Sequence, residues 1–307
     1  MTPAIFGIAG AELTADERAF FREADPAGYI LFGRNCVDPQ QLRALTDDLR
    51  SIHGRERLLV SIDQEGGRVA RLRPPHWAHY PSGQVFDELY QIAPASAIEA
   101  ARAGAHAMAL ELSAMGITVD FHAPLDVRRP ETDQAIGDRA LGSNPMQVAA
   151  LGRAVIDGMT SGGVAGCLKH MPGHGRATAD SHFELPVVEA SAEELEIDIS
   201  PFRALSARAS IGMSAHIVFP VWDAARPATL SPTIIEEIIR EQIGFDGLLL
   251  TDDIDMEALD GTVPERAVAA HKAGCDIVLN CWAKMPDMIA IADQLPAMTE
   301  LVQARLD

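Results

Sequence analysis

VAGCLKHMPGHGRATADSH, residues 164–182, tells more about this chain than any other segment. Its first five residues, 164–168, are small or apolar and are typical of a buried strand. Charged and imidazole side chains follow at once, in a segment too rich in glycine and proline to be a helix. Enzymes built on strand scaffolds carry their catalytic residues in such loops. The stretch therefore predicts a strand that leads directly into part of a functional site.

Seven further apolar runs resemble the one at 164–168, and helical patterns separate most of them. The runs lie at 5–9, 29–32, 58–62, 117–121, 211–215, 248–251 and 276–279. The helical patterns lie at 39–52, 96–115, 145–161, 192–209, 231–243 and 264–273. Several have clear start signals, such as Asp38-Pro39 and Asn144-Pro145. Eight strands that alternate with helices predict an α/β fold with parallel pairing, and their number favours a closed TIM-type (β/α)8 barrel over an open doubly wound sheet.

The sequence shows no linker, low-complexity tract or internal repeat. The two long irregular stretches, 66–87 and 125–141, are better explained as loops over a functional face than as domain boundaries. We therefore expect residues 1–307 to form a single barrel domain.

Composition excludes several classes of protein. The chain has 307 residues, of which 48% are hydrophobic and 22% charged, as in ordinary globular proteins. Its formal net charge of -19 disfavours a nucleic acid or an anionic membrane as partner, because the field repels phosphate. No apolar run is long enough to span a membrane, and no signal peptide is visible. The four cysteines form no Cys-x-x-Cys pair, which is typical of free thiols in a reducing compartment, so we expect a cytoplasmic protein.

Titratable residues follow five of the predicted strands. Because the ends of barrel strands converge on one rim, these groups are expected to line one pocket. They are Asp63, Arg68 and Arg71 after the third strand, Asp120, His122 and Asp126 at the fourth, Lys169 and His170 at the fifth, His216 at the sixth, and Asp252 and Asp253 at the seventh.

Two groups in this set suit the cleavage of a glycosidic bond, which needs a carboxylate at the anomeric carbon and an acid at the leaving oxygen. Asp252 follows a rigid apolar strand and is the candidate nucleophile. His182 is the candidate acid/base, because imidazole titrates near neutrality. Asp180, two residues earlier, is placed to hold the other ring nitrogen of His182.

Structural alternatives exist for several of these residues. The Asp180-x-His182 pair could stabilise a turn, as could His174 between two glycines. Asp63 could form a loop-closing ion pair with Arg68 or Arg71, and Asp253 is expected to point to the other side of the strand from Asp252. A zinc site built from His170, His174, Asp180 and His182 is the main chemical rival, disfavoured by the neighbouring Lys169 and by the absence of a His-Glu-x-x-His motif.

Four separated motifs together resemble glycoside hydrolase family 3, in particular its short, single-domain β-N-acetylhexosaminidases. The likeness covers about residues 5–285. The motifs are Asp63-Gln64-Glu65-Gly66-Gly67-Arg68-Val69-Ala70-Arg71, Ile136-Gly137-Asp138-Arg139-Ala140-Leu141, the segment from Lys169-His170 to Asp180-Ser181-His182, and Thr251-Asp252-Asp253-Ile254-Asp255-Met256.

The resemblance implies a role for each matched residue. Asp252 corresponds to the nucleophile and His182, paired with Asp180, to the acid/base. The residues that match positions holding N-acetylglucosamine are Asp63, Arg71, Arg139, Lys169 and His170. Enzymes of this type are retaining, use no metal or other cofactor, and release terminal N-acetylglucosamine from anhydro-muropeptides in the cytoplasm during peptidoglycan recycling. A sugar substrate, no nucleic acid or membrane partner and a monomeric state are therefore expected.

The sequence leaves several alternative functions open. The chain departs from the usual pattern at Met171 and Asp255, which match no catalytic position but could alter the shape of a subsite or the packing of a loop. A family 3 β-glucosidase or β-xylosidase, or a glycoside phosphorylase, would use the same fold. A sugar-binding sensor is disfavoured, because a binder has no need of Asp252, Asp180 and His182 together.

Overall fold

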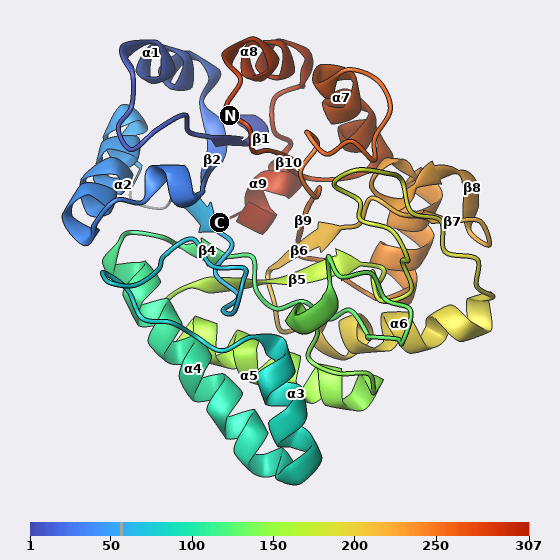
Figure 1. The fold of residues 1–307 in the computed structure, drawn as a ribbon. Helices are drawn as coiled ribbons and strands as arrows, with labels where there is room; N and C mark the ends of the chain where they lie inside the picture. Colours follow the sequence, from blue (N-terminus) through green and yellow to red (C-terminus); the bar gives the residue numbers. More distant parts are fainter. Residues whose placement is uncertain (56–57, 307) are drawn as a thin grey trace.

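The computed structural model describes residues 1–55 and 58–306, which include all the predicted site residues. Within these ranges, eight parallel strands form a sheet in the order β10-β1-β2-β3-β4-β5-β6-β9 (Figure 1). A parallel bridge between Leu250 and Ile277 joins the two edges and closes the sheet. The predicted (β/α)8 barrel is therefore confirmed. The strands are β1 (Thr2–Gly7), β2 (Pro26–Leu31), β3 (Leu59–Ile62), β4 (Val119–Asp120), β5 (Ala165–Met171), β6 (Ile211–Ser214), β9 (Leu248–Leu250) and β10 (Val278–Asn280).

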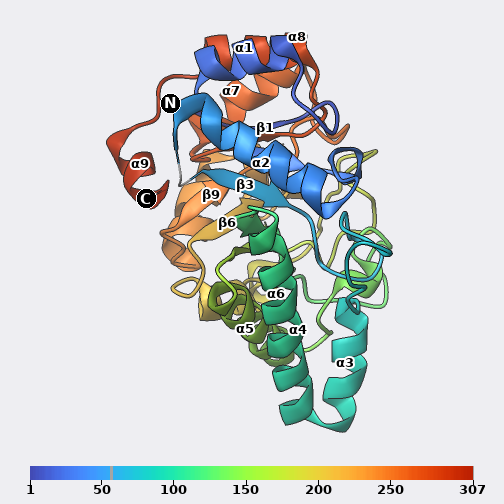
Figure 2. The same ribbon diagram turned by 90° about the vertical axis from the view of Figure 1, so that its left-hand side faces the viewer.

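Helices surround the sheet, and the pair α3–α4 projects beyond it (Figure 2). They are α1 (Ala15–Ala24), α2 (Pro39–His53), α3 (Gly83–Ile92), α4 (Pro94–Ala114), α5 (Pro145–Ser161), α6 (Ala192–Leu205), the π-type helix η4 (Ile234–Gln242), α7 (Val263–Ala273), α8 (Met285–Gln294) and α9 (Glu300–Leu306). A short hairpin, β7 (Val218–Phe219) and β8 (Asp223–Pro227), lies between β6 and η4. No described helix is long and apolar enough to cross a membrane.

Two of the predicted helix starts are capped as expected. The Asp38 carboxylate accepts a hydrogen bond from the amide of Gln41, and the Asn144 side chain accepts from Met146 and Gln147. These bonds satisfy amides that have no partner within the helix. The stretches expected to be irregular are only partly so, because α3 begins at Gly83 within 66–87 and a 3-10 turn, η2 (Gly137–Arg139), lies within 125–141.

The fifth strand is longer than the sequence indicates. The prediction ended it at residue 168, but β5 continues to Met171, so Lys169 and His170 belong to the strand. The prediction was wrong because charged residues rarely sit in a buried strand without partners. Here Lys169 is paired with Glu65 and His170 with Asp126, and these partners come from other parts of the chain.

Side chains of each strand alternate between the barrel interior and the surrounding helices. In β1, Ile5 belongs to the interior cluster and Phe6 to the outer one. In β5, Cys167 points to the interior and Leu168 to the helices. Lys169 follows Cys167 by two residues, so the alternation places the ammonium group in the barrel mouth.

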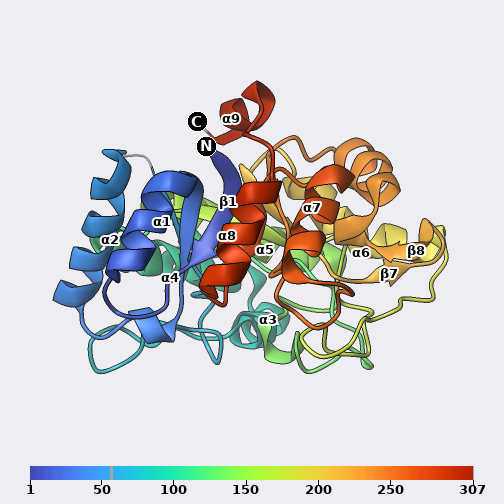
Figure 3. The same ribbon diagram turned by 90° about the horizontal axis from the view of Figure 1, so that it is seen from above.

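The barrel closes at a seam between β9 and β10 that contains a buried charge network. The Asp276 carboxylate accepts hydrogen bonds from Arg240 at 2.7 Å, from Arg305 at 3.0 Å and from the amide of Leu249 at 2.9 Å. Arg305 lies in α9, which sits at the end of the barrel opposite the long loops (Figure 3). Asp276 therefore ties the last two strands to both η4 and α9.

We predict that Asp276→Ala lowers the free energy of unfolding by about 3 kcal/mol, because it leaves two arginines without their buried counterion. Urea denaturation provides the measurement. Asp246→Ala is the matched control, since its carboxylate also pairs with Arg305 but its side chain is 94% exposed. That change should cost less than about 1 kcal/mol. Equal losses from the two variants would contradict the role given to the seam.

Candidate active site

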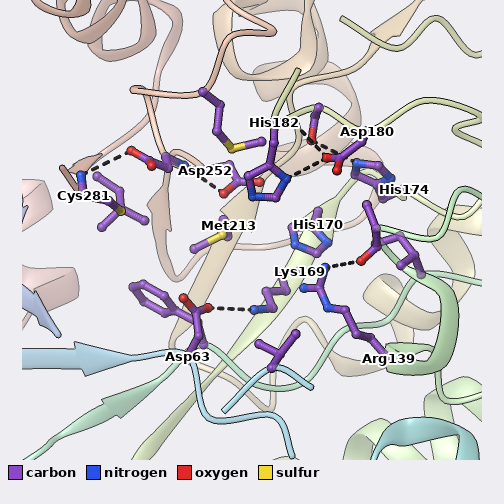
Figure 4. Close-up of a pocket in the computed structure, with 18 of the residues that line it drawn as sticks. Asp63, Arg139, Lys169, His170, His174, Asp180, His182, Met213, Asp252 and Cys281 are labelled. Atoms are coloured by element: carbon purple, nitrogen blue, oxygen red, sulfur yellow. Dashed lines mark hydrogen bonds and ion pairs between the residues drawn. The ribbon is translucent and has the colours of Figure 1, made fainter. Parts of the chain in front are cut away.

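One pocket opens at the carboxyl ends of the strands, with a volume of about 350 Å³ (Figure 4). All eight residues that the sequence predicts for the site line it. They are Asp63, Arg71, Arg139, Lys169, His170, Asp180, His182 and Asp252. They come from segments up to 189 positions apart, from Asp63 after β3 to Asp252 after β9, so the barrel is what brings them together.

The prediction that polar residues from five strand ends line the pocket is only partly correct. Strands β3, β5 and β9 contribute as expected, but β4 and β6 contribute Phe121 and Met213 to the lining. Their predicted polar residues Asp120, His122, Asp126 and His216 are not among the lining residues. All four are buried, and Asp126, for example, is paired with His170. These groups support the lining and do not form it.

The floor of the pocket is a network of buried and half-buried opposite charges. Lys169 lies 3.2 Å from a carboxylate oxygen of Asp63 and 2.6 Å from one of Glu65. Arg139 makes two bonds to Glu65, at 2.8 and 2.9 Å, and Arg71 lies 3.0 Å from Asp63. Burial opposes ionisation of Asp63 and Glu65, but the neighbouring cations outweigh it and lower the pKa of both carboxyls. The floor is therefore fully ionised.

Glu65 is the residue whose importance the sequence interpretation missed. It was quoted within a motif but given no role, although its carboxylate joins the two cations of the floor. Its side chain is 3% exposed, against 20% for Asp63, so Glu65 lies behind the surface that a ligand would touch. The signal available in the sequence was its position in the motif that follows β3, two residues after Asp63.

A second buried carboxylate, Asp126, orders the wall next to the floor. It lies 2.8 Å from Nδ1 of His170 and accepts a hydrogen bond from the amide of His174 at 2.7 Å. Burial opposes its ionisation, but His170 lowers the pKa of Asp126. The bond at Nδ1 leaves Nε2 of His170 available to the pocket.

His174 lies beside His170, with ring centroids 5.5 Å apart, and burial lowers its pKa to about 4. It lines the pocket as a neutral ring, and its Nε2 lies 3.4 Å from the hydroxyl of Ser181. The neighbouring Gly175 packs against the backbone of Val127 so closely that a Cβ would lie 2.0 Å from the carbonyl oxygen. This contact fixes where the loop leaves the barrel.

Asp252 stands directly after β9 at the edge of the pocket. Burial alone would raise the pKa of Asp252, but the imidazole of His170 and the amide of Asp253 lower it to about 2. The Asp253 amide donates to Asp252 at 2.8 Å. The Asp253 carboxylate accepts from the amides of Asp255 and Cys281, at 3.0 and 3.3 Å. Asp252 is thus an anion in the pocket, while Asp253 holds the backbone around it.

His182 and Asp180 lie on the loop above Asp252 (Figure 4). Nδ1 of His182 is 2.7 Å from Asp180, and the same oxygen accepts the amide of His182 at 2.9 Å. These contacts outweigh burial and lower the pKa of Asp180. The side chain of His182 is 61% exposed, in contrast to the buried floor. The pair observed is the one that the sequence predicted, and it leaves Nε2 free to face a ligand.

The structure tests two of the alternatives to a catalytic site, namely the ion pair of Asp63 and the zinc site. Asp63 pairs with Arg71, whereas Arg68 pairs with Asp138 at 2.7 Å and holds the turn that carries Arg139. No group of three or more His, Cys, Asp or Glu residues in the described ranges is arranged to hold a metal ion. The absence of a metal or other cofactor stays a prediction.

The arrangement combines three chemical capacities. Buried, ionised groups on the floor can bind several hydroxyls through charge-assisted hydrogen bonds. Asp252 offers an unprotonated carboxylate on a rigid strand, and His182 offers a ring nitrogen that can give or take a proton. An anion and a proton donor that face one small polar cavity are the groups that glycoside cleavage requires.

Comparisons with known proteins agree with this chemistry. The model of the glycosyl hydrolase family 3 N-terminal domain matches residues 7–307. A β-hexosaminidase of Bordetella avium is 38% identical over 290 residues, which cover 93% of this chain and 81% of the relative. One of Alkalilimnicola ehrlichii is 40% identical, over 91% of this chain and 80% of the relative.

Among solved structures, NagZ from Neisseria gonorrhoeae in complex with N-trifluoroacetyl-D-glucosamine superposes with a TM-score of 0.91. It is 34% identical to this chain, and the match covers 99% of this chain and 88% of that protein.

We predict that Glu65→Gln lowers the free energy of unfolding by about 3 kcal/mol, because it leaves Lys169 and Arg139 buried without their shared anion. Chemical denaturation measures this loss. Asp138→Asn is the matched control, because it removes a pair with Arg68 whose side chain is 48% exposed. The control should cost less than about 1 kcal/mol. A Glu65→Gln protein as stable as the wild type would show that Glu65 does not organise the floor.

Proposed function

Because the chain belongs to glycosyl hydrolase family 3, we propose that it is a retaining exo-β-N-acetylglucosaminidase acting through a covalent glycosyl-enzyme. Its relatives and structural neighbours identify it as a glycosidase of the β-hexosaminidase type. Its substrates are proposed to be anhydro-muropeptides, from which it removes non-reducing terminal N-acetylglucosamine in the cytoplasm during peptidoglycan recycling. Residues 1–307 are proposed to act as a single catalytic domain and as a monomer.

The observation that carries this proposal is the opposition of Asp252 and the His182–Asp180 pair across one pocket (Figure 4). A carboxylate with a pKa of about 2 stays ionised at neutral pH and can serve as nucleophile. The 2.7 Å contact with Asp180 fixes the His182 tautomer, so that Nε2 is the atom that exchanges a proton with substrate.

The proposed reaction has two steps. Asp252 attacks the anomeric carbon while the bond to the leaving oxygen breaks, and protonated His182 gives its proton to that oxygen. In the second step neutral His182 takes a proton from water, the water oxygen bonds to the anomeric carbon, and the Asp252 carboxylate leaves. Two inversions retain the configuration.

The floor is proposed to hold the sugar that is cleaved. Asp63 accepts hydrogen bonds from hydroxyls, while Arg71, Arg139, Lys169 and His170 donate to them. Because these groups are already paired, either with one another or with Glu65 and Asp126, they are held in place before substrate arrives, and binding requires little reorganisation. Such a floor fits a polar, uncharged sugar ring.

Trapping of the intermediate tests the nucleophile. Incubation with a 5-fluoro derivative of N-acetylglucosamine that carries a good leaving group should add one sugar mass to the peptide that contains Asp252, because the fluorine slows the second step. Peptide mass spectrometry provides the measurement. Asp252→Asn should show no label, and a label on another residue would overturn the assignment. Turnover of an aryl β-glucoside in preference to the aryl β-N-acetylglucosaminide would favour a β-glucosidase.

The acid/base is tested by comparing leaving groups. His182→Ala should lower kcat by about 100-fold to 10,000-fold for a disaccharide, whose leaving oxygen needs a proton. The loss should be smaller than about tenfold for a dinitrophenyl glycoside, whose leaving group departs without one. Steady-state kinetics on both substrates measure the two losses in kcat. His106→Ala, at a half-buried histidine of α4 remote from the pocket lining, should change neither rate, and equal losses on both substrates for His182→Ala would argue against His182 as the acid.

A further inference from the structure

The group that leaves during cleavage must lie outside the pocket, above His182. The floor is closed by buried charges, and the cavity of about 350 Å³ has room for little more than one sugar. The anomeric carbon lies near Asp252, and the leaving oxygen lies near His182, because these two residues act on them. The remainder of the substrate therefore rests on the rim formed by the loops around Asp252 and His182.

Two exposed aromatic side chains belong to this rim. Phe183, next to His182, is 73% exposed, and Trp282, next to the pocket residue Cys281, is 50% exposed. Of the Phe, Tyr and Trp residues in the described part of the chain, these two alone are exposed. An aromatic ring combines a large apolar face with a defined geometry, so a ring exposed beside a pocket is suited to pack against a sugar face.

The backbone at both aromatic residues is hydrogen-bonded to the loop that follows the nucleophile. The carboxylate of Asp255 accepts a hydrogen bond from the amide of Trp282 at 3.1 Å. The carbonyl oxygen of His182 accepts one from the amide of Glu257 at 3.3 Å. Residues 255 and 257 of one short loop thus bind the backbone of both aromatic segments. The next residue after Trp282, Ala283, has a φ of 56°, so the chain turns sharply there.

The side chain of Lys284 contacts the ring of Trp282. The ammonium group of Lys284 lies 4.4 Å from the centre of the Trp282 ring. Lys284 makes no ion pair with a carboxylate within residues 1–55 and 58–306, although the chain has an excess of 19 negative charges. It is therefore available to an anion of the ligand.

We propose that Phe183, Trp282 and Lys284 form a subsite for the leaving group and select a sugar that bears a carboxylate. The two rings pack against the sugar, and Lys284 pairs with its anionic substituent. This inference rests on the proposed function, and it names the residues that give the enzyme its preference among N-acetylglucosaminides.

The test compares three substrates that share the cleaved sugar. They are the disaccharide of N-acetylglucosamine with anhydro-N-acetylmuramic acid, the methyl ester of its lactyl carboxylate, and the methyl β-glycoside of N-acetylglucosamine. Phe183→Ala and Trp282→Ala should each raise KM for the disaccharide by about tenfold, because an aromatic contact is lost. Their kcat/KM for the methyl glycoside should stay within about twofold of the wild type. Ile92→Ala, at a position 83% exposed on α3, is the matched control.

The lysine is tested by the ratio of kcat/KM for the acid to that for its ester. Lys284→Met should lower this ratio by about fivefold, whereas Lys272→Met, at an exposed lysine of α7, should leave it unchanged. An unchanged ratio for Lys284→Met, or unchanged KM values for both aromatic variants, would overturn the inference. A wild-type enzyme that cleaves the methyl glycoside but not the disaccharide would also overturn it. Failure to cleave any of the three substrates would instead refute the proposed function.

Discussion

The buried carboxylate of Glu65 is the group on which the rest of the site depends. It contacts Lys169 and Arg139, which lie on β5 and in the turn η2, and so joins three distant segments by charge. Isolated, each of these ions would be strongly unfavourable in the barrel mouth, whereas together they are paired and hydrogen-bonded. The pairing permits β5 to continue through Lys169, and this continuation brings His170 to the wall of the pocket.

The groups of the site differ in how deeply they are buried and in how firmly they are held. The floor residues are buried and paired, so their positions are set before a ligand enters. Asp252 is an anion on the end of a strand, where the backbone is rigid. His182, the proposed acid/base, lies on an exposed loop, where it can face both the sugar and the group that leaves. The exposed residues Phe183 and Trp282 each follow a residue that lines the pocket.

Much of the architecture could be predicted from local patterns. Eight apolar runs each overlap a barrel strand, and the capping residues Asp38 and Asn144 begin the helices where expected. The outer helix α1 was not among the predicted helical patterns, because half of its ten residues are charged and only Glu17 and Phe21 are buried. The end of β5 and the role of Glu65 were missed for a different reason. Both depend on partners distant in sequence, and no local pattern reports whether a charged side chain will find one.

The order of the barrel strands and the residue types at their ends could be predicted from sequence alone. So could the Asp180–His182 pairing, since two residues in one loop are close in any fold. Which strand-end residues face the pocket depends instead on how the barrel closes. The fold turned Phe121 and Met213 inward in place of the polar residues of β4 and β6, and it gave Asp126 to His170 as a buried partner. The physical reason is that the cost of a buried charge depends on its neighbours in space, and barrel closure is what chooses those neighbours.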